Sequence, residues 1–79
     1  MQPVHSHMHH SSSLLSSAIV QAWIISALRS HGPLTRAALH QHVRQVGIGR
    51  LSQELNRLRR QRLVYRDTIS PPRWFTRPD

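Results

Sequence analysis

The sequence contains no cysteine, no lysine and only three acidic residues among its 79. Without cysteine there is neither a disulfide framework nor a thiolate metal site, so packing alone must hold the fold. Glu54, Asp67 and Asp79 are the only carboxylates, which leaves little material for an acid–base pair, and no cysteine nucleophile exists. The composition therefore predicts a protein that is not an enzyme, with no cofactor and no small-molecule substrate.

Long apolar runs are also missing. The most apolar stretch, Leu14–Ser30, is too short for a bilayer, which needs ~20 apolar residues, and Gln21 and several serines interrupt it. We therefore expect a core helix here and no membrane partner. A chain of this size buries only about 60–65% of its unfolded surface on folding, so it has room for one small domain.

Arginine is abundant instead. Eleven arginines give the chain a formal net charge of +8. Five of them lie in the ten residues Arg57–Arg66, whereas no acidic residue precedes Glu54. Clustering within one expected element predicts a polyanionic partner, nucleic acid before membrane.

The chain divides into a polar tail and one compact unit. Residues 1–13 are rich in histidine and serine and have almost nothing to bury, so we expect a disordered tail. The four histidines of this tail have no cysteine or carboxylate beside them, so we expect no metal site there: His5, His7, His9 and His10. Residues 14–79 are expected to form a single, monomeric domain, either alone or within a larger or tandem-domain protein.

Two helices are expected in the first half of the unit. The first covers Leu14–Ser30, and its apolar side is expected to consist of Leu14, Ala18, Gln21, Ile25 and Leu28, broadened by Leu15, Ile19, Ala22 and Trp23. Gly32 and Pro33 end this helix, because glycine suits a left-handed conformation and proline bars continuation. Thr35 is expected to cap a short second helix over Arg36–Val43.

The second half changes from helical to alternating periodicity. A third helix is expected over Arg50–Arg62, with a narrow buried seam beneath a wide basic face: Leu51, Leu55 and Leu58. Two short strands follow, Leu63–Asp67 and Arg73–Arg77, joined by a loop that two prolines stiffen. Three helices followed by a β-hairpin predict an α+β winged helix-turn-helix, in which the third helix and the wing face nucleic acid.

The start of the last strand resembles a known family. The segment Ser70-Pro71-Pro72-Arg73-Trp74 is similar to the wing signature of Zα domains, and the resemblance extends over residues 19–76. Members of that family bind left-handed Z-form DNA and RNA, and they occur in RNA-editing proteins and innate immune sensors. The resemblance implies the same fold and phosphate contacts from the third helix and the wing.

Two registers relate the third helix to the family. In the first, Ser52 corresponds to the groove-facing Asn of the family and Asn56 to its base-stacking Tyr. The rival register keeps Asn56 and Arg57 as an Asn-Arg pair and puts Arg60 at the Tyr position, but it drives Arg62 into the core. In both registers the aromatic ring is missing, and stacking on a base contributes ~1–3 kcal/mol.

From the arginine cluster and the resemblance together, the candidate nucleic-acid-binding residues are Ser52, Gln53, Asn56, Arg57, Arg60, Ser70, Pro71, Pro72, Arg73 and Trp74. Guanidinium groups suit phosphate oxygens, and the two prolines would offer a rigid apolar surface. Trp74 is expected to anchor the wing, and a purely structural contact between hairpin and helix is an equal alternative to a water-mediated phosphate contact.

Two other functions fit the same sequence. One is a winged-helix module that binds RNA or ordinary duplex without preference for the Z form, for example in RNA processing. The other is a protein–protein interaction module, served by the apolar first helix and the proline-rich wing. The sequence does not choose between DNA and RNA, and it leaves mitochondrial, nuclear and cytoplasmic locations open.

Overall fold

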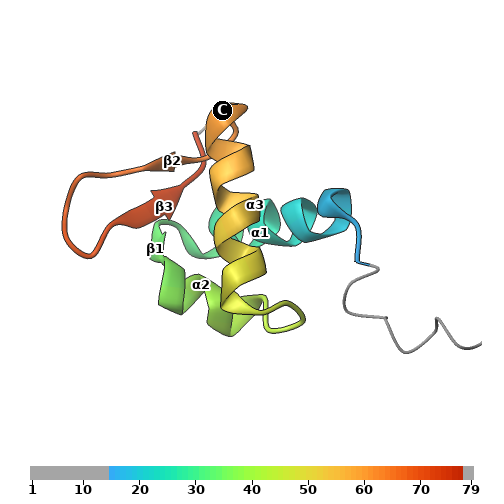
Figure 1. Ribbon diagram of the computed structural model, residues 1–79. Helices are drawn as coiled ribbons and strands as arrows, with labels where there is room; N and C mark the ends of the chain where they lie inside the picture. Colours follow the sequence, from blue (N-terminus) through green and yellow to red (C-terminus); the bar gives the residue numbers. More distant parts are fainter. Residues whose placement is uncertain (1–14, 78–79) are drawn as a thin grey trace, which may run out of the picture.

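The computed structural model describes residues 15–77, which fold into three helices and a three-stranded antiparallel sheet (Figure 1). In chain order the elements are α1 (Ser17–His31), β1 (Leu34–Thr35), α2 (Arg36–His42), α3 (Ile48–Arg60), β2 (Tyr65–Arg66) and β3 (Arg73–Phe75). This order confirms the predicted α+β winged helix-turn-helix and adds β1, a strand that the sequence did not predict. The tail predicted over residues 1–13 lies outside the described residues.

Side-chain and glycine caps fix the ends of the first two helices. The Ser16 Oγ accepts a hydrogen bond from the backbone N–H of Ile19 at 3.1 Å, so α1 begins three residues later than predicted. Gly32 ends α1 with a φ of 80°, as expected for a glycine in this position. The Thr35 Oγ1 accepts from the N–H of Ala38 at 3.1 Å, which confirms it as the cap of α2.

The buried side of α1 differs from the predicted one. Val20, Ile24 and Leu28 are its buried residues, whereas Ala18 and Ala22 from the predicted face are exposed. The predicted stripe was right for Leu28 but missed Val20 and Ile24, because α1 carries apolar residues around most of its circumference. Periodicity alone therefore does not fix which side turns toward α3.

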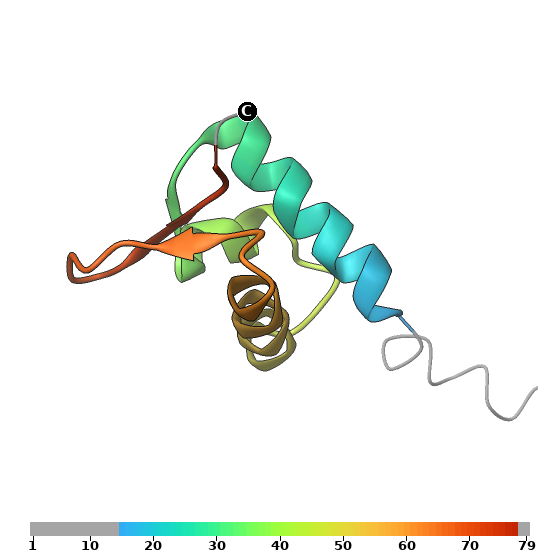
Figure 2. The ribbon, with the colours of Figure 1, turned by 90° about the horizontal axis from the view of Figure 1, so that it is seen from above.

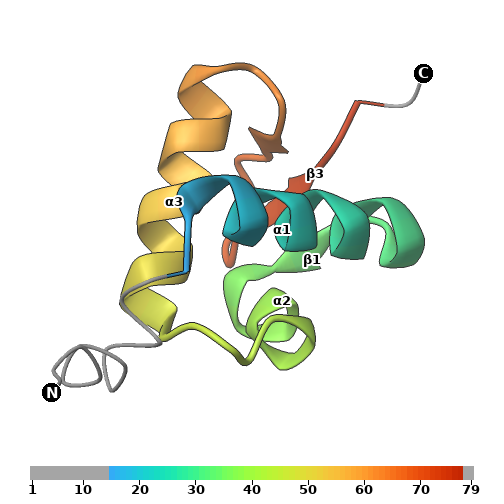
Figure 3. The ribbon, with the colours of Figure 1, turned by 90° about the vertical axis from the view of Figure 1, so that its right-hand side faces the viewer.

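The predicted seam of α3 is confirmed. Leu51, Leu55 and Leu58 are fully buried, and Glu54 is fully buried beside them. These residues join side chains from the other elements in one core, which consists of Val20, Ile24, Leu28, Leu39, Val43, Val46, Leu51, Leu55, Leu58, Val64 and Trp74. Figure 3 shows α1 crossing α3, and the two helices are in direct contact.

The sheet has the order β1-β3-β2, so β3 forms hydrogen bonds with both neighbours. Trp74 of β3 lies opposite Leu34 of β1 and Arg66 of β2, and Tyr65 lies opposite Phe75. The paired segments are shorter than the predicted strands. Between β2 and β3 the chain forms a loop over residues 67–72, which we call the wing loop, and Figure 2 shows this hairpin projecting on one side of α3 while α1 passes on the other.

Candidate nucleic-acid interface

One edge of the solvent-facing side of α3 lies next to the wing. Ile48, Ser52 and Arg59 follow this edge, because residues at these spacings stack along one face of a helix. Ile48 borders a shallow hollow that reaches Pro72, and Arg59 borders a second hollow that also reaches Pro72. The helix and the wing therefore form one continuous surface.

The middle of the solvent-facing side of α3 is polar and open. Gln53, Asn56 and Arg60 are all exposed. Asn56 and Arg60 share a third hollow with Arg59. These amide and guanidinium groups are free to meet a ligand that lies along the helix.

The wing side of the surface is apolar at its base. Trp74 is only 5% exposed, and the guanidinium of Arg66 lies over its ring, 5.5 Å from the ring centroid. Pro71 is exposed and Pro72 is half-buried, and the Ser70–Pro71 peptide bond is cis. Both prolines and Trp74 border the same hollow as Ile48.

Arg73 of the wing is already paired with a carboxylate. Its backbone N–H donates to Asp67 Oδ1 at 2.9 Å, and its Nε donates to Oδ2 at 3.2 Å. These bonds, above all the one from the backbone N–H, lower the pKa of Asp67 below its usual range. The pair closes the wing loop and offsets the charge of Arg73.

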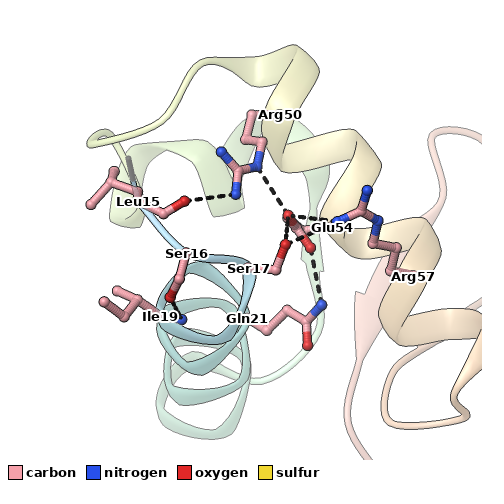
Figure 4. A network of polar contacts seen from close by, with 8 residues as sticks. All are labelled: Leu15, Ser16, Ser17, Ile19, Gln21, Arg50, Glu54 and Arg57. Carbon is pink, nitrogen blue, oxygen red and sulfur yellow. Dashed lines mark hydrogen bonds and ion pairs between the residues drawn. The ribbon is translucent and has the colours of Figure 1, made fainter. Parts of the chain in front are cut away.

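Opposite the wing, the other edge of α3 is attached to α1 by a network around Glu54 (Figure 4). The Ser17 Oγ donates to Glu54 Oε2 at 2.8 Å, and Gln21 Nε2 donates to Oε1 at 3.0 Å. Arg50 Nε donates to Oε2 at 2.9 Å. Arg57 Nη1 lies 3.4 Å from Oε2 and donates to the Ser17 Oγ at 2.9 Å. The Glu54 network thus ties two residues of α1 to three of α3.

Glu54 is ionised in this network. Burial of the carboxyl group raises its pKa, but donors from Gln21, Ser17 and Arg50 and the charge of Arg57 outweigh that effect. The pKa of Glu54 therefore lies below its ordinary value of 4.5. A buried carboxylate with four donors stabilises the contact between α1 and α3 near neutral pH.

Comparison with known proteins bears on the fold. No family model matches the sequence, and no curated protein matches it. The structure is similar to the Zα domain of PKZ from Carassius auratus, solved in complex with Z-DNA, with a TM-score of 0.71 and 20% sequence identity. The match covers 77% of this chain and 97% of the other. The chain has the fold of a Zα domain. This confirms, for the fold, the resemblance carried by the wing sequence.

The structure of this Zα fold agrees with the first of the two registers. Arg62 lies beyond the end of α3 and is exposed, whereas the rival register requires it in the core. Leu51 and Leu55 occupy buried positions, as the first register requires. That Ser52 and Asn56 correspond to the Asn and Tyr of the family stays a prediction.

The Zα fold brings most of the candidate residues to one surface. Those at or between the two hollows beside the wing are Ser52, Ser70, Pro71, Pro72 and Trp74, and those on the open middle of α3 are Gln53, Asn56 and Arg60. Arg57 lies apart from them, on the edge that faces α1. Arg73 is on the wing, but its guanidinium is turned to Asp67.

Sequence reasoning missed four residues of this surface. Arg36 borders the first hollow and donates from Nη1 to the Ser52 Oγ at 3.1 Å. Ile48 and Arg59 lie on the same edge of α3 as Ser52, so helical spacing from Ser52 was a signal that could have found them. Arg66 had no such signal, because its place over Trp74 follows from the pairing of β2 with β3.

Two other kinds of site are absent from residues 15–77. No three histidine or carboxylate side chains of this part gather in a way that could hold a metal ion. None of its helices combines the length and apolar character needed to cross a membrane. The histidines at positions 5, 7, 9 and 10 lie outside the described residues.

Proposed function

We propose that this chain binds nucleic acid, as a monomer and without catalysis, through the outer side of α3 and the wing, and that it prefers left-handed Z-form duplex. One observation carries the proposal: α3 and the proline-rich wing border the same two hollows, so a single ligand can contact both. The net charge of +8 favours a polyanion as that ligand.

The polar contacts come from the middle of α3. Gln53, Asn56 and Arg60 are exposed and lie within two turns of the helix, a spacing that suits successive phosphates. Guanidinium groups bind phosphate oxygens with two parallel hydrogen bonds. Arg57, whose side chain is 52% exposed, would add a contact at the α1 edge of this surface. Ser52 would support the same contacts from the wing edge.

The wing supplies shape rather than charge. Pro71 and Pro72 present a rigid apolar surface toward the backbone of the ligand. Trp74 anchors this surface, because it is almost fully buried and lies on the central strand of the sheet. Ser70 adds a hydroxyl beside the prolines, and Arg73 contributes little net charge because Asp67 holds it.

Preference for the Z form is supported by the fold, since the similar Zα domain of PKZ was solved with Z-DNA. The substitution at Asn56 weakens that preference, because an amide replaces the family's stacking ring. Restoring the ring should therefore strengthen it. We expect Asn56→Tyr to tighten binding to Z-form duplex by about 5- to 150-fold, the equivalent of ~1–3 kcal/mol of stacking.

Circular dichroism on CG-repeat duplexes of DNA and of RNA tests the proposal. Inversion of the near-ultraviolet spectrum on titration with the protein supports Z-form binding, and Asn56→Tyr should reach it at lower protein concentration. Salt-dependent binding without inversion would instead indicate a winged-helix module that reads only charge. Binding that ignores salt, or none at all, would contradict nucleic acid as the ligand.

A pair of charge variants tests the surface itself. Arg60→Gln should weaken binding to every sequence and reduce the slope of log K against log salt by ~0.9 on duplex DNA, the value for one phosphate contact. Arg29→Gln removes the same charge from α1, where Arg29 borders a hollow made by α1 residues alone. Equal effects of the two variants would show that overall charge, not α3, is responsible.

A further inference from the structure

A basic hollow lies between the second half of α3 and the wing loop. Arg59 borders it from α3, Arg66 from β2, and Thr68 and Ser70 from the wing loop. Two arginines and two hydroxyl-bearing residues thus lie around it. Neither arginine was among the residues that the sequence suggested for binding.

Both arginines have their charge available. In the described part of the chain, the carboxylates pair with Arg50, Arg57 and Arg73, and neither Arg59 nor Arg66 forms an ion pair there. Glu54 therefore offsets the arginine charges at the α1 edge of α3, and Asp67 offsets the charge of Arg73 on β3. The hollow between α3 and the wing loop stays positive.

Arg66 is also held in position before any ligand arrives. Its guanidinium lies over the Trp74 ring, 5.5 Å from the centroid, and Trp74 is itself buried. A side chain that is ordered in advance loses less conformational entropy on binding. A guanidinium group over an aromatic ring can still donate hydrogen bonds from its N–H groups to a phosphate.

One carboxylate borders the hollow and must be accounted for. Asp67 would repel an anion if its charge faced the ligand. Both of its oxygens instead accept hydrogen bonds from Arg73, one from the backbone N–H and one from Nε. The net charge around the hollow therefore stays positive and favours an anion.

We propose that this hollow binds one phosphate group of a nucleic-acid backbone, held by Arg59 and Arg66 with Thr68 and Ser70 as further donors. The inference rests on the proposed function and extends its footprint. The bound strand would continue past Asn56 toward the second half of α3 and the wing loop. We choose phosphate as the ligand because two guanidinium groups and two hydroxyl groups can all donate hydrogen bonds to its oxygens. None of these four groups carries a negative charge that would repel it.

Salt-dependent binding to a CG-repeat DNA duplex tests the subsite. Arg59→Gln and Arg66→Gln should each weaken binding by about tenfold, as for loss of a charged hydrogen bond, and the two together should lower the salt slope by ~0.9, the value for the one phosphate that they share. Arg29→Gln on α1 is the matched control and should change affinity by less than about twofold, because salt screens distant charges. Thermal unfolding of each variant checks that the fold is intact.

A conservative variant separates the charge of Arg66 from the shape of its guanidinium group. Arg66→Lys keeps the positive charge but loses the planar guanidinium group over Trp74, so it should keep the wild-type salt slope while recovering only part of the affinity lost in Arg66→Gln. If Arg59→Gln and Arg66→Gln keep the wild-type affinity and slope while Arg60→Gln lowers both, the subsite is wrong and the proposed function stands. If the unaltered protein shows no salt-dependent binding, both are wrong.

Discussion

Glu54→Gln is the perturbation that most directly tests how α3 is held in place. The substitution keeps the size of the side chain but removes the charge that Arg50 and Arg57 share. Glu54 is fully buried, so its contacts are shielded from water. Breaking a buried ion pair costs ~3–5 kcal/mol when it strands a buried charge.

The cost here should fall below that range. The arginines left behind are 27% and 52% exposed, so their guanidinium groups can turn to water. We expect a loss of about 2 kcal/mol, the size of a charged hydrogen bond. A domain of this class is stable by only ~5–15 kcal/mol, so such a loss is large. It corresponds to a fall in Tm of about 8–16 °C, at 4–8 °C for each kcal/mol.

Urea unfolding at several pH values is the assay. The pKa of Glu54 is lowered in the folded protein, so its stabilisation is complete above the ordinary value of 4.5 and is lost as pH falls through the folded value. The difference between wild type and Glu54→Gln should therefore be full at neutral pH and shrink in acid. Equal midpoints at neutral pH would refute a stabilising role for the network. A difference that persists unchanged in acid would show that the charge is not its cause.

Two further predictions concern the backbone at helix ends. Gly32→Ala should destabilise the protein by about 1–2 kcal/mol, because a φ of 80° strains any residue with a Cβ, although no atom lies within 4 Å of that position. Gly49→Ala is its matched control and should instead stabilise by about 1 kcal/mol, because Gly49 lies within α3 and also has open space around it. Thr35→Ala should cost about 1 kcal/mol, since it removes the side-chain acceptor of α2, whereas Thr35→Ser should keep most of the stability. Urea unfolding measures all four changes, and a destabilised Gly49→Ala or an unaffected Thr35→Ala would contradict these assignments.

The buried residues of α3 and the buried side of α1 show what the periodicity of apolar residues can and cannot predict. Leu51, Leu55 and Leu58 were predictable because a narrow apolar stripe on an otherwise polar helix has only one side to bury. Helix α1 offers apolar residues on most sides, so its sequence did not reveal that Val20 and Ile24 would face the core. Only contact with the other elements selects that side.

The short strand β1 illustrates a second limit. Two residues, Leu34 and Thr35, are too few to show an alternating pattern. They become a strand because the edge of β3 lies beside them and offers backbone partners at Trp74 and Arg73. The third strand of the sheet is thus a product of the packing.

The arginines of α3 show the same division within the candidate site. Arg57 and Arg59 are near neighbours in sequence, yet two residues turn a helix by about 200°, so they lie on opposite edges. The sequence could place them apart, but it could not say which edge meets the wing. Burial of Glu54 decides this, because it draws Arg57 toward Ser17 on α1 and leaves Arg59 facing the wing loop.

Local spacing and composition were enough to predict the three helices, the end residues Gly32 and Thr35, the hairpin with its prolines and the excess of positive charge. What the tertiary structure decided is which edge of α3 lies against α1 and which edge faces the wing. That choice depends on a carboxylate on α3 meeting two residues of α1, and side chains more than thirty positions apart in the chain are brought together only by the fold.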